Sequence, residues 1–145
     1  MISLSDRGNK FSCEVKTYEF PNAKDDLDAN WLIICIKAEQ EVEGSWTACG
    51  PCLRTRELVS LSKWLKSLQV EMLPSRIEFM EGELAFEFSG DMKFVVMLDF
   101  NFHPRSAVYD YSSDREFPLY FSIDENTITE LICSVEKAIR VFPKR

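Results

Sequence analysis

The chain has 145 residues, the length of one ordinary domain, and a domain of this size buries roughly 70% of the surface that its unfolded chain exposes. Hydrophobic residues make up 46% of the chain and charged residues 28%, which excludes a disordered or fibrous protein. The net charge of −7 argues against binding to nucleic acid or to an anionic membrane and favours a basic protein partner.

Targeting signals and cysteine usage both favour a cytoplasmic protein. The first eight residues contain no apolar signal segment, and no later run is long enough to span a bilayer. The five cysteines are an odd count, which does not fit a secreted disulfide framework. We expect Cys13, Cys35 and Cys133 to be small buried hydrophobic side chains in a reducing compartment.

The first half of the chain predicts three strands and a helix. Alternating residues over 11–18 predict a half-buried strand, and the apolar run 31–38 predicts a central strand covered on both faces. A third strand follows over 45–53, where Pro51 cannot donate a backbone hydrogen bond, so this strand lies at a sheet edge or ends there. Thr55 is the expected N-cap of the helix. Its buried stripe comprises Leu58, Leu61, Leu65 and Leu68.

The second half predicts four strands and a second helix. Residues 76–81 and 83–88 alternate as a hairpin, residues 93–103 form a long core strand, and Pro118 opens the last strand. The final helix begins with capping-box spacing at Thr127 and stops before Pro143. The predicted fold is therefore one α+β domain over residues 1–145, mainly antiparallel β-sheet of about seven strands, in the order βββα-ββββ-α.

Three acidic or aromatic loops are candidate partner-binding sites. The loop 22–30 lacks the ligand spacing of an EF-hand calcium loop, so a solvated acidic turn is expected there. A second acidic turn spans 39–44, and the long segment 104–116 is polar and aromatic, as functional loops in compact domains often are. The candidate contact residues are Asp25, Asp26, Asp28, Glu39, Glu41, Glu43, Tyr109, Asp110 and Tyr111.

The motif Cys49-Gly50-Pro51-Cys52 predicts an alternative function, that of a thiol-disulfide oxidoreductase. Its surroundings disfavour this function, because the helical period begins only after Thr55, where the helix dipole no longer reaches Cys49. The three successive strands predicted between residues 76 and 103 also do not fit a thioredoxin fold.

Other chemistry finds less support in the sequence. Zinc is disfavoured because the remaining cysteines and His103 are isolated from one another. A hydrolase would require His103 together with Ser112 or Ser113 and Asp110, but no nucleophile-elbow motif is present, so a strand-end or capping histidine is expected. We therefore expect no catalytic residue, no metal and no cofactor.

Several short segments carry a family resemblance. They are Asp28-Ala-Asn-Trp-Leu-Ile33, the acidic turn with Gly44 and Trp46, Leu53-Arg-Thr-Arg-Glu-Leu58, Trp64-Leu65, the hairpin ending at Phe88, and Val141-Phe-Pro143. Together they resemble the WapI-type immunity protein family of bacteria. Cys49 and Cys52 depart from the family's pattern, in which no conspicuous Cys-x-x-Cys precedes the Leu-Arg-Thr segment.

The resemblance implies a non-enzymatic protein that binds and neutralises the C-terminal domain of a contact-dependent or polymorphic toxin. It assigns no toxin-contact residues and leaves the activity of the toxin and the oligomeric state open. A basic nuclease domain is a suitable partner, because acidic clusters on this chain would steer it and raise the association rate.

Overall fold

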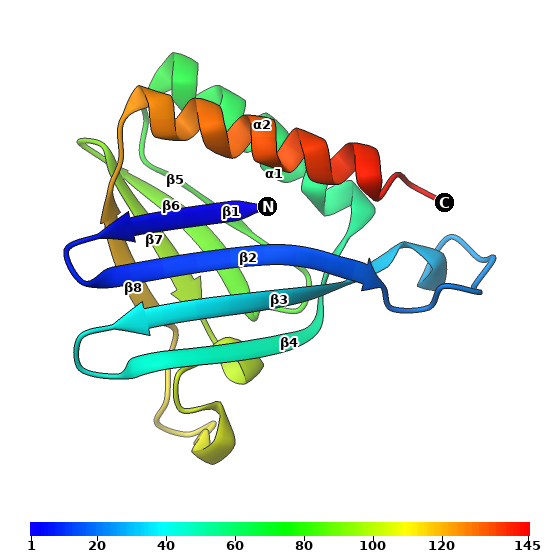
Figure 1. The fold of residues 1–145 in the computed structure, drawn as a ribbon, viewed down its shortest axis with the longest axis horizontal. Coiled ribbons are helices and arrows are strands. Elements are labelled where there is room, and N and C mark those ends of the chain that lie inside the picture. Colours follow the sequence, from blue (N-terminus) through cyan, green and yellow to red (C-terminus); the bar gives the residue numbers. More distant parts are fainter.

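The computed structural model describes all 145 residues and contains two four-stranded antiparallel sheets and two long helices (Figure 1). The first sheet comprises β1 (Ile2–Asp6), β2 (Asn9–Tyr18), β3 (Trp31–Gln40) and β4 (Gly44–Arg54), in that order. The second comprises β5 (Ser75–Glu78), β6 (Leu84–Gly90), β7 (Lys93–Leu98) and β8 (Phe117–Ser122). The helices are α1 (Thr55–Glu71) and α2 (Glu125–Val141), and short 3-10 turns form η1 (Asp28–Asn30), η2 (Phe100–Phe102) and η3 (Ser106–Val108). The predicted α+β class with two helices is confirmed, with eight strands in place of about seven.

A single hydrophobic core joins the two sheets and the helices. In Figure 1 the first sheet stands in front of the second, and α1 and α2 run side by side across the top. The core contains 30 buried residues drawn from both sheets and both helices. Aromatic rings connect the sheets, since Phe11 of β2 packs edge-on against Phe86 of β6, which also contacts Phe79 and Phe94. The sheets therefore belong to one folding unit.

The additional strand is β1, where buried Ile2 and Leu4 alternate with exposed Ser3 and Ser5. It pairs with β2 through a tight turn in which Arg7 and Gly8 both have positive φ. Two apolar positions are too few for periodicity to predict a strand. The pairing with β2 and the burial of two side chains stabilise it instead.

The strand predicted over 93–103 ends at Leu98, five residues earlier than expected. The Asp99 carboxylate accepts a hydrogen bond from the backbone N–H of Phe100, and the chain turns into η2. Phe102 is fully buried, but Phe100 remains 38% exposed. The alternation of apolar residues continues in the sequence to Phe102, but the hydrogen-bonded pairing of β7 stops at Leu98, so the predicted length of this strand is wrong.

Both helices begin at residues other than the predicted caps. The N-cap of α1 is Arg54, whose backbone N–H donates to the Glu57 carboxylate at 2.8 Å, and Thr55 is already helical. The N-cap of α2 is Asp124, whose carboxylate accepts from the backbone N–H of Thr127 at 2.7 Å. Thr127 is thus the third helical residue and not the cap, because Asp124 supplies the stronger acceptor upstream.

The edge position predicted for the strand with Pro51 is confirmed, because β4 is the last strand of the first sheet. Pro51 offers no N–H to a further strand. The Asn101 side chain of η2 donates to the Cys49 carbonyl at 3.3 Å, and the Trp46 indole N–H donates to the Phe102 carbonyl at 3.0 Å. The segment after β7 therefore covers this edge, which limits edge-to-edge aggregation.

Candidate partner-binding surface

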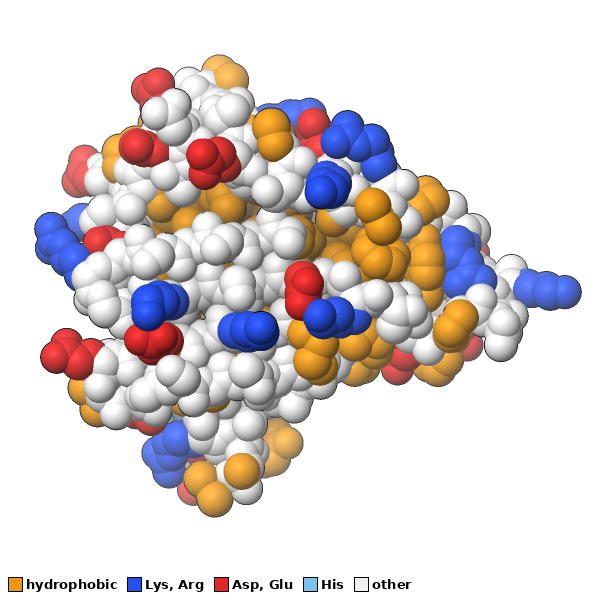
Figure 2. All heavy atoms as spheres, in the orientation of Figure 1, with side chains coloured by type: hydrophobic (Ala, Val, Ile, Leu, Met, Phe, Trp, Pro, Cys, Tyr) orange, Lys and Arg blue, Asp and Glu red, His pale blue; other side chains and the backbone are white.

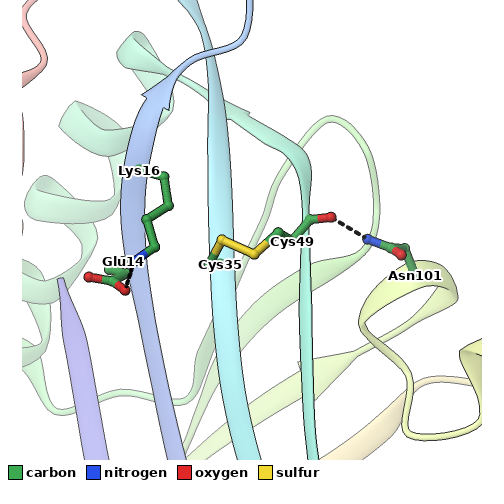
Figure 3. The surroundings of a disulfide bond; sticks show 5 residues. All are labelled: Glu14, Lys16, Cys35, Cys49 and Asn101. Carbon is green, nitrogen blue, oxygen red and sulfur yellow. Dashed lines mark hydrogen bonds and ion pairs between the residues drawn. A yellow bond between two sulfur atoms is a disulfide. The ribbon is translucent and has the colours of Figure 1, made fainter.

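The cysteine motif does not form the predicted dithiol. Cys49 lies directly opposite Cys35 on β3 and is bonded to it in a disulfide on the outer face of the first sheet (Figure 3). Cys52 is fully buried. Burial raises the pKa of the Cys52 thiol well above its ordinary value, so Cys52 is a poor nucleophile. The alternative of an oxidoreductase acting through Cys49 and Cys52 is contradicted by this pairing.

Of the three cysteines predicted to be buried thiols, only Cys13 is one in the structure. Cys13 is buried as predicted, and burial raises the pKa of its thiol to about 12. Cys133 is exposed on α2, and Cys35 is half-buried in the disulfide, so both were wrongly predicted to be buried thiols. Spacing along the chain could not predict the Cys35–Cys49 bridge, because it depends on the register of β3 against β4.

His103 serves the packing of its loop. Its Nδ1 accepts the backbone N–H of Arg105 at 3.0 Å, and its ring packs edge-on against Tyr109 and Phe117. The hydroxyls of Ser112 and Ser113 both donate to the Asp110 carboxylate. No hydrogen bond joins His103 to these groups, and no cluster of three or more His, Cys, Asp or Glu side chains has the geometry to hold a metal ion.

The first predicted acidic site, between β2 and β3, uses its carboxylates to shape the loop. The Asp25 carboxylate accepts hydrogen bonds from the backbone N–H groups of Leu27 and Asp28. The hydrogen bond from Asp28 is the main reason that the pKa of Asp25 is lowered. Asp26 forms an ion pair with Lys144 at 2.8 Å. Asp28 is exposed in the first position of η1.

Arg54 attaches this loop to the rest of the fold. Its guanidinium is buried, donates from Nη2 to the carbonyls of Asp26 at 2.7 Å and Leu27 at 3.0 Å, and lies 5.7 Å from the centre of the Trp31 ring. The Leu-Arg-Thr segment thus joins β4, α1 and the acidic loop. Its role in the structure is to fix this junction.

The second predicted acidic site is the turn between β3 and β4, at the opposite end of the first sheet (Figure 1). Glu39 is paired with Lys10 at 3.1 Å across the β2–β3 ladder. Glu41 and Glu43 are exposed and form no ion pair. The two acidic loops are therefore separated by the length of the strands and do not form one surface.

The third predicted site contains an exposed aromatic cluster. Tyr111 is 80% exposed and stacks on Phe100 with ring centres 6.0 Å apart, and Tyr109 contacts both rings. The Tyr109 hydroxyl donates to Asp99, and this hydrogen bond is the main reason that the pKa of Tyr109 rises to about 12. Asp110 accepts hydrogen bonds from the serines beside it and shapes the loop. Tyr109 and Tyr111 are thus brought together with Phe100, which was expected inside the core.

The tip of the β5–β6 hairpin adjoins this cluster. Gly82 lies against Phe100, since a Cβ on Gly82 would be 3.7 Å from a carbon of the Phe100 ring. Met80 is 56% exposed, and its backbone N–H donates to Glu57 at 2.9 Å. We name the residues Met80, Glu81, Glu83, Phe100, Tyr109 and Tyr111 the edge patch. The first three belong to the β5–β6 connection, which meets the Phe100 ring at Gly82, and Glu83 lies beside Gly50 of β4.

The carboxylates of the edge patch lack basic partners. One carboxylate oxygen of Glu83 is buried without a hydrogen-bond partner, beside Gly50 of β4. Burial, reinforced by the negative charge of Glu81, raises the pKa of Glu83 to about 7. The pKa of Glu19 is also raised, by burial and then by the charges of Glu81 and Asp28. Glu81, which forms no ion pair, therefore supplies the unpaired negative charge of the edge patch, whereas Glu83 is only partly ionised at neutral pH.

Replacing Glu83 with glutamine should change the pH dependence of stability. A carboxyl whose pKa rises on folding, from 4.5 to about 7, destabilises the fold when it ionises, and this loss grows between those values and is complete above them. Glutamine cannot ionise, so the free energy of unfolding of Glu83→Gln should exceed that of wild type by about 1–2 kcal/mol at pH 8 and nearly equal it at pH 4.5. The figure at pH 8 is reduced because the side chain is partly exposed to solvent. Urea unfolding at both pH values measures this, with exposed Glu130→Gln as control. An equal difference at both pH values would contradict the assignment.

The outer face of the first sheet is a second open surface. Two shallow depressions of about 390 and 560 Å³ lie over it. Serine, threonine and charged residues form most of the wall of the smaller one, and half of the residues that line the larger one are hydrophobic. Figure 2 views this face, which is largely polar with scattered charges. Its charges are mostly balanced, because Lys10 pairs with Glu39 and Lys16 pairs with Glu14. This face thus lacks the net negative charge of the edge patch.

Comparison with known proteins adds the family. No helix in the structure has both the length and the apolar character needed to cross a membrane. No curated protein and no solved structure is significantly similar to the chain. The model of the immunity protein WapI-like family matches residues 1–143, nearly the whole chain and all eight strands and both helices. The chain therefore belongs to the immunity protein WapI-like family.

Proposed function

We propose that this protein acts in the bacterial cytoplasm as a non-enzymatic immunity protein that binds the C-terminal domain of a toxin and neutralises it. The observation that carries the proposal is the family match over residues 1–143. The net charge of −7 supports a basic toxin domain, for which a nuclease is the leading candidate.

The mode of action follows from the chemistry of the side chains. The only histidine is engaged in loop packing, and the motif that could support redox chemistry is divided between a disulfide and a buried thiol. Neutralisation by binding needs only a complementary surface, and specificity for one toxin then lies in the side chains of that surface.

Co-expression tests the proposal. We expect a large secreted protein to be encoded next to this gene. The probe is the C-terminal domain of that protein, produced from an inducible promoter with or without this chain. We expect growth arrest with the toxin domain alone and growth restored by co-expression, together with a complex of the two purified proteins. An unrelated toxin domain of similar charge serves as control. Absence of both protection and complex formation would contradict the proposed function for this pair.

A further inference from the structure

Three large exposed apolar side chains belong to the edge patch. Tyr111 is 80% exposed, Met80 56% and Phe100 38%, and the Phe100 and Tyr111 rings are stacked against each other. Aromatic side chains in such clusters dominate the binding energy of most protein interfaces, because they bury much surface and lose little conformational entropy. The patch therefore has the composition of an interface centre.

The backbone holds this cluster in a fixed and strained position. Phe100 has a φ of +46°, a conformation that non-glycine residues rarely adopt. It is held by Asp99, whose carboxylate accepts both the Phe100 backbone N–H and the Tyr109 hydroxyl. Strained residues that the surroundings hold in place cluster at binding sites, where a preformed geometry reduces the entropy lost on binding.

The charges around the aromatic rings select the class of partner. Glu81 and Glu83 form no ion pair, whereas Glu78 and Glu116 on the neighbouring face are paired with Arg76. The two arginines of the loop are held by local contacts, since Arg105 pairs with Asp114 at 3.2 Å and Arg115 donates to the carbonyls of Ser112 and Asp114. Of these two charges, only that of Arg105 is neutralised by an ion pair. A positively charged surface complements this arrangement, and an arginine side chain can stack on the exposed tyrosine ring while facing the carboxylates.

We propose that the edge patch is the docking surface for a basic face of the toxin domain, with an arginine or lysine side chain of the toxin packed on Tyr111 and facing Glu81. This inference rests on the proposed function and adds the surface and the chemistry of the contact. The acidic turns at Asp25–Asp28 and Glu39–Glu43 then lie outside the centre of the interface and contribute to long-range steering.

Binding measurements with matched variants test the docking surface. The probe is the same C-terminal toxin domain, titrated against the full chain by calorimetry and by surface plasmon resonance. We expect Tyr111→Ala and Met80→Ser each to weaken binding at least tenfold, whereas Tyr120→Ala, which removes a 62% exposed tyrosine from the outer face of the second sheet, should leave affinity within twofold.

Two matched charge-reversal variants isolate the electrostatic contribution to toxin binding. Glu81→Lys and Glu130→Lys change the net charge equally, but Glu130 is exposed on α2, whereas Glu81 directly precedes Gly82, which lies against the Phe100 ring. We expect Glu81→Lys to lower the association rate at least tenfold at low salt and Glu130→Lys to lower it less than threefold. Thermal unfolding of each variant confirms that it is folded.

The outcomes separate the two proposals. A wild-type chain that neither binds nor protects against the toxin domain contradicts the proposed function and, with it, the docking surface. Wild-type binding that survives in Tyr111→Ala, Met80→Ser and Glu81→Lys overturns the docking surface and leaves the immunity function standing. Equal losses of toxin affinity in the patch variants and in their controls also overturn the docking surface. It is likewise overturned if the patch variants disrupt a homodimer of this chain without weakening toxin binding.

Discussion

Replacing Phe86 with alanine should lower the free energy of unfolding by about 4 kcal/mol, the largest effect expected of a single substitution in this chain. Phe86 is fully buried, and its ring lies 5.7 Å from that of Phe94, 5.9 Å from Phe79 and 6.4 Å from Phe11. Its ring thus joins Phe11 of β2 in the first sheet to the aromatic rings of Phe79 and Phe94 on the other side of the core. Alanine would remove this contact and leave a cavity between the sheets.

Urea unfolding followed by tryptophan fluorescence measures the loss for Phe86→Ala. Phe86→Leu keeps most of the volume and should cost less than half as much, whereas Phe20→Ala, at an exposed ring, should change stability by less than about 0.5 kcal/mol. A loss below about 1.5 kcal/mol for Phe86→Ala would show that the sheets do not depend on this ring for their packing.

Replacing Arg54 with alanine should lower the free energy of unfolding by about 2–3 kcal/mol, although a surface arginine at a helix start would normally contribute little. Arg54 is only 6% exposed, and its guanidinium bonds two carbonyls of the acidic loop and stacks on Trp31. Alanine leaves the Leu27 carbonyl without its donor, removes one of the two donors to the Asp26 carbonyl and removes the packing of a long side chain.

Arg56→Ala is the matched control for Arg54→Ala, because Arg56 is two residues away on the same helix turn and exposed. It should change stability by less than about 0.5 kcal/mol. Amide hydrogen exchange should show faster opening of residues 22–30 in Arg54→Ala but not in Arg56→Ala. Unchanged exchange in that loop would mean that the two carbonyl contacts do not anchor it.

Candidate site residues were predictable from sequence only in part. Tyr109 and Tyr111 lie in a long polar loop, and that context alone identified them. Phe100 and Met80 were missed, because Phe100 continues the alternation of a core strand and Met80 lies in a segment expected to be ordinary hairpin. The signal that could have placed Phe100 outside the core is Asp99, a residue that favours caps over strand interiors.

The sequence by itself determined the α+β class, the two helices with their leucine and isoleucine stripes and the hairpin around Glu81-Gly82. For the strand with Pro51 it left two alternatives, a sheet edge or an early end, and the structure decided for the edge. These depend on local periodicity and backbone chemistry, which each segment carries within itself. Only the tertiary structure decided that Cys49 pairs with Cys35, that β7 ends at Leu98, and that the β5–β6 connection meets the Phe100 ring, which stacks on Tyr111. Those outcomes depend on strand register and on contacts between segments distant in the chain, and no single segment encodes them.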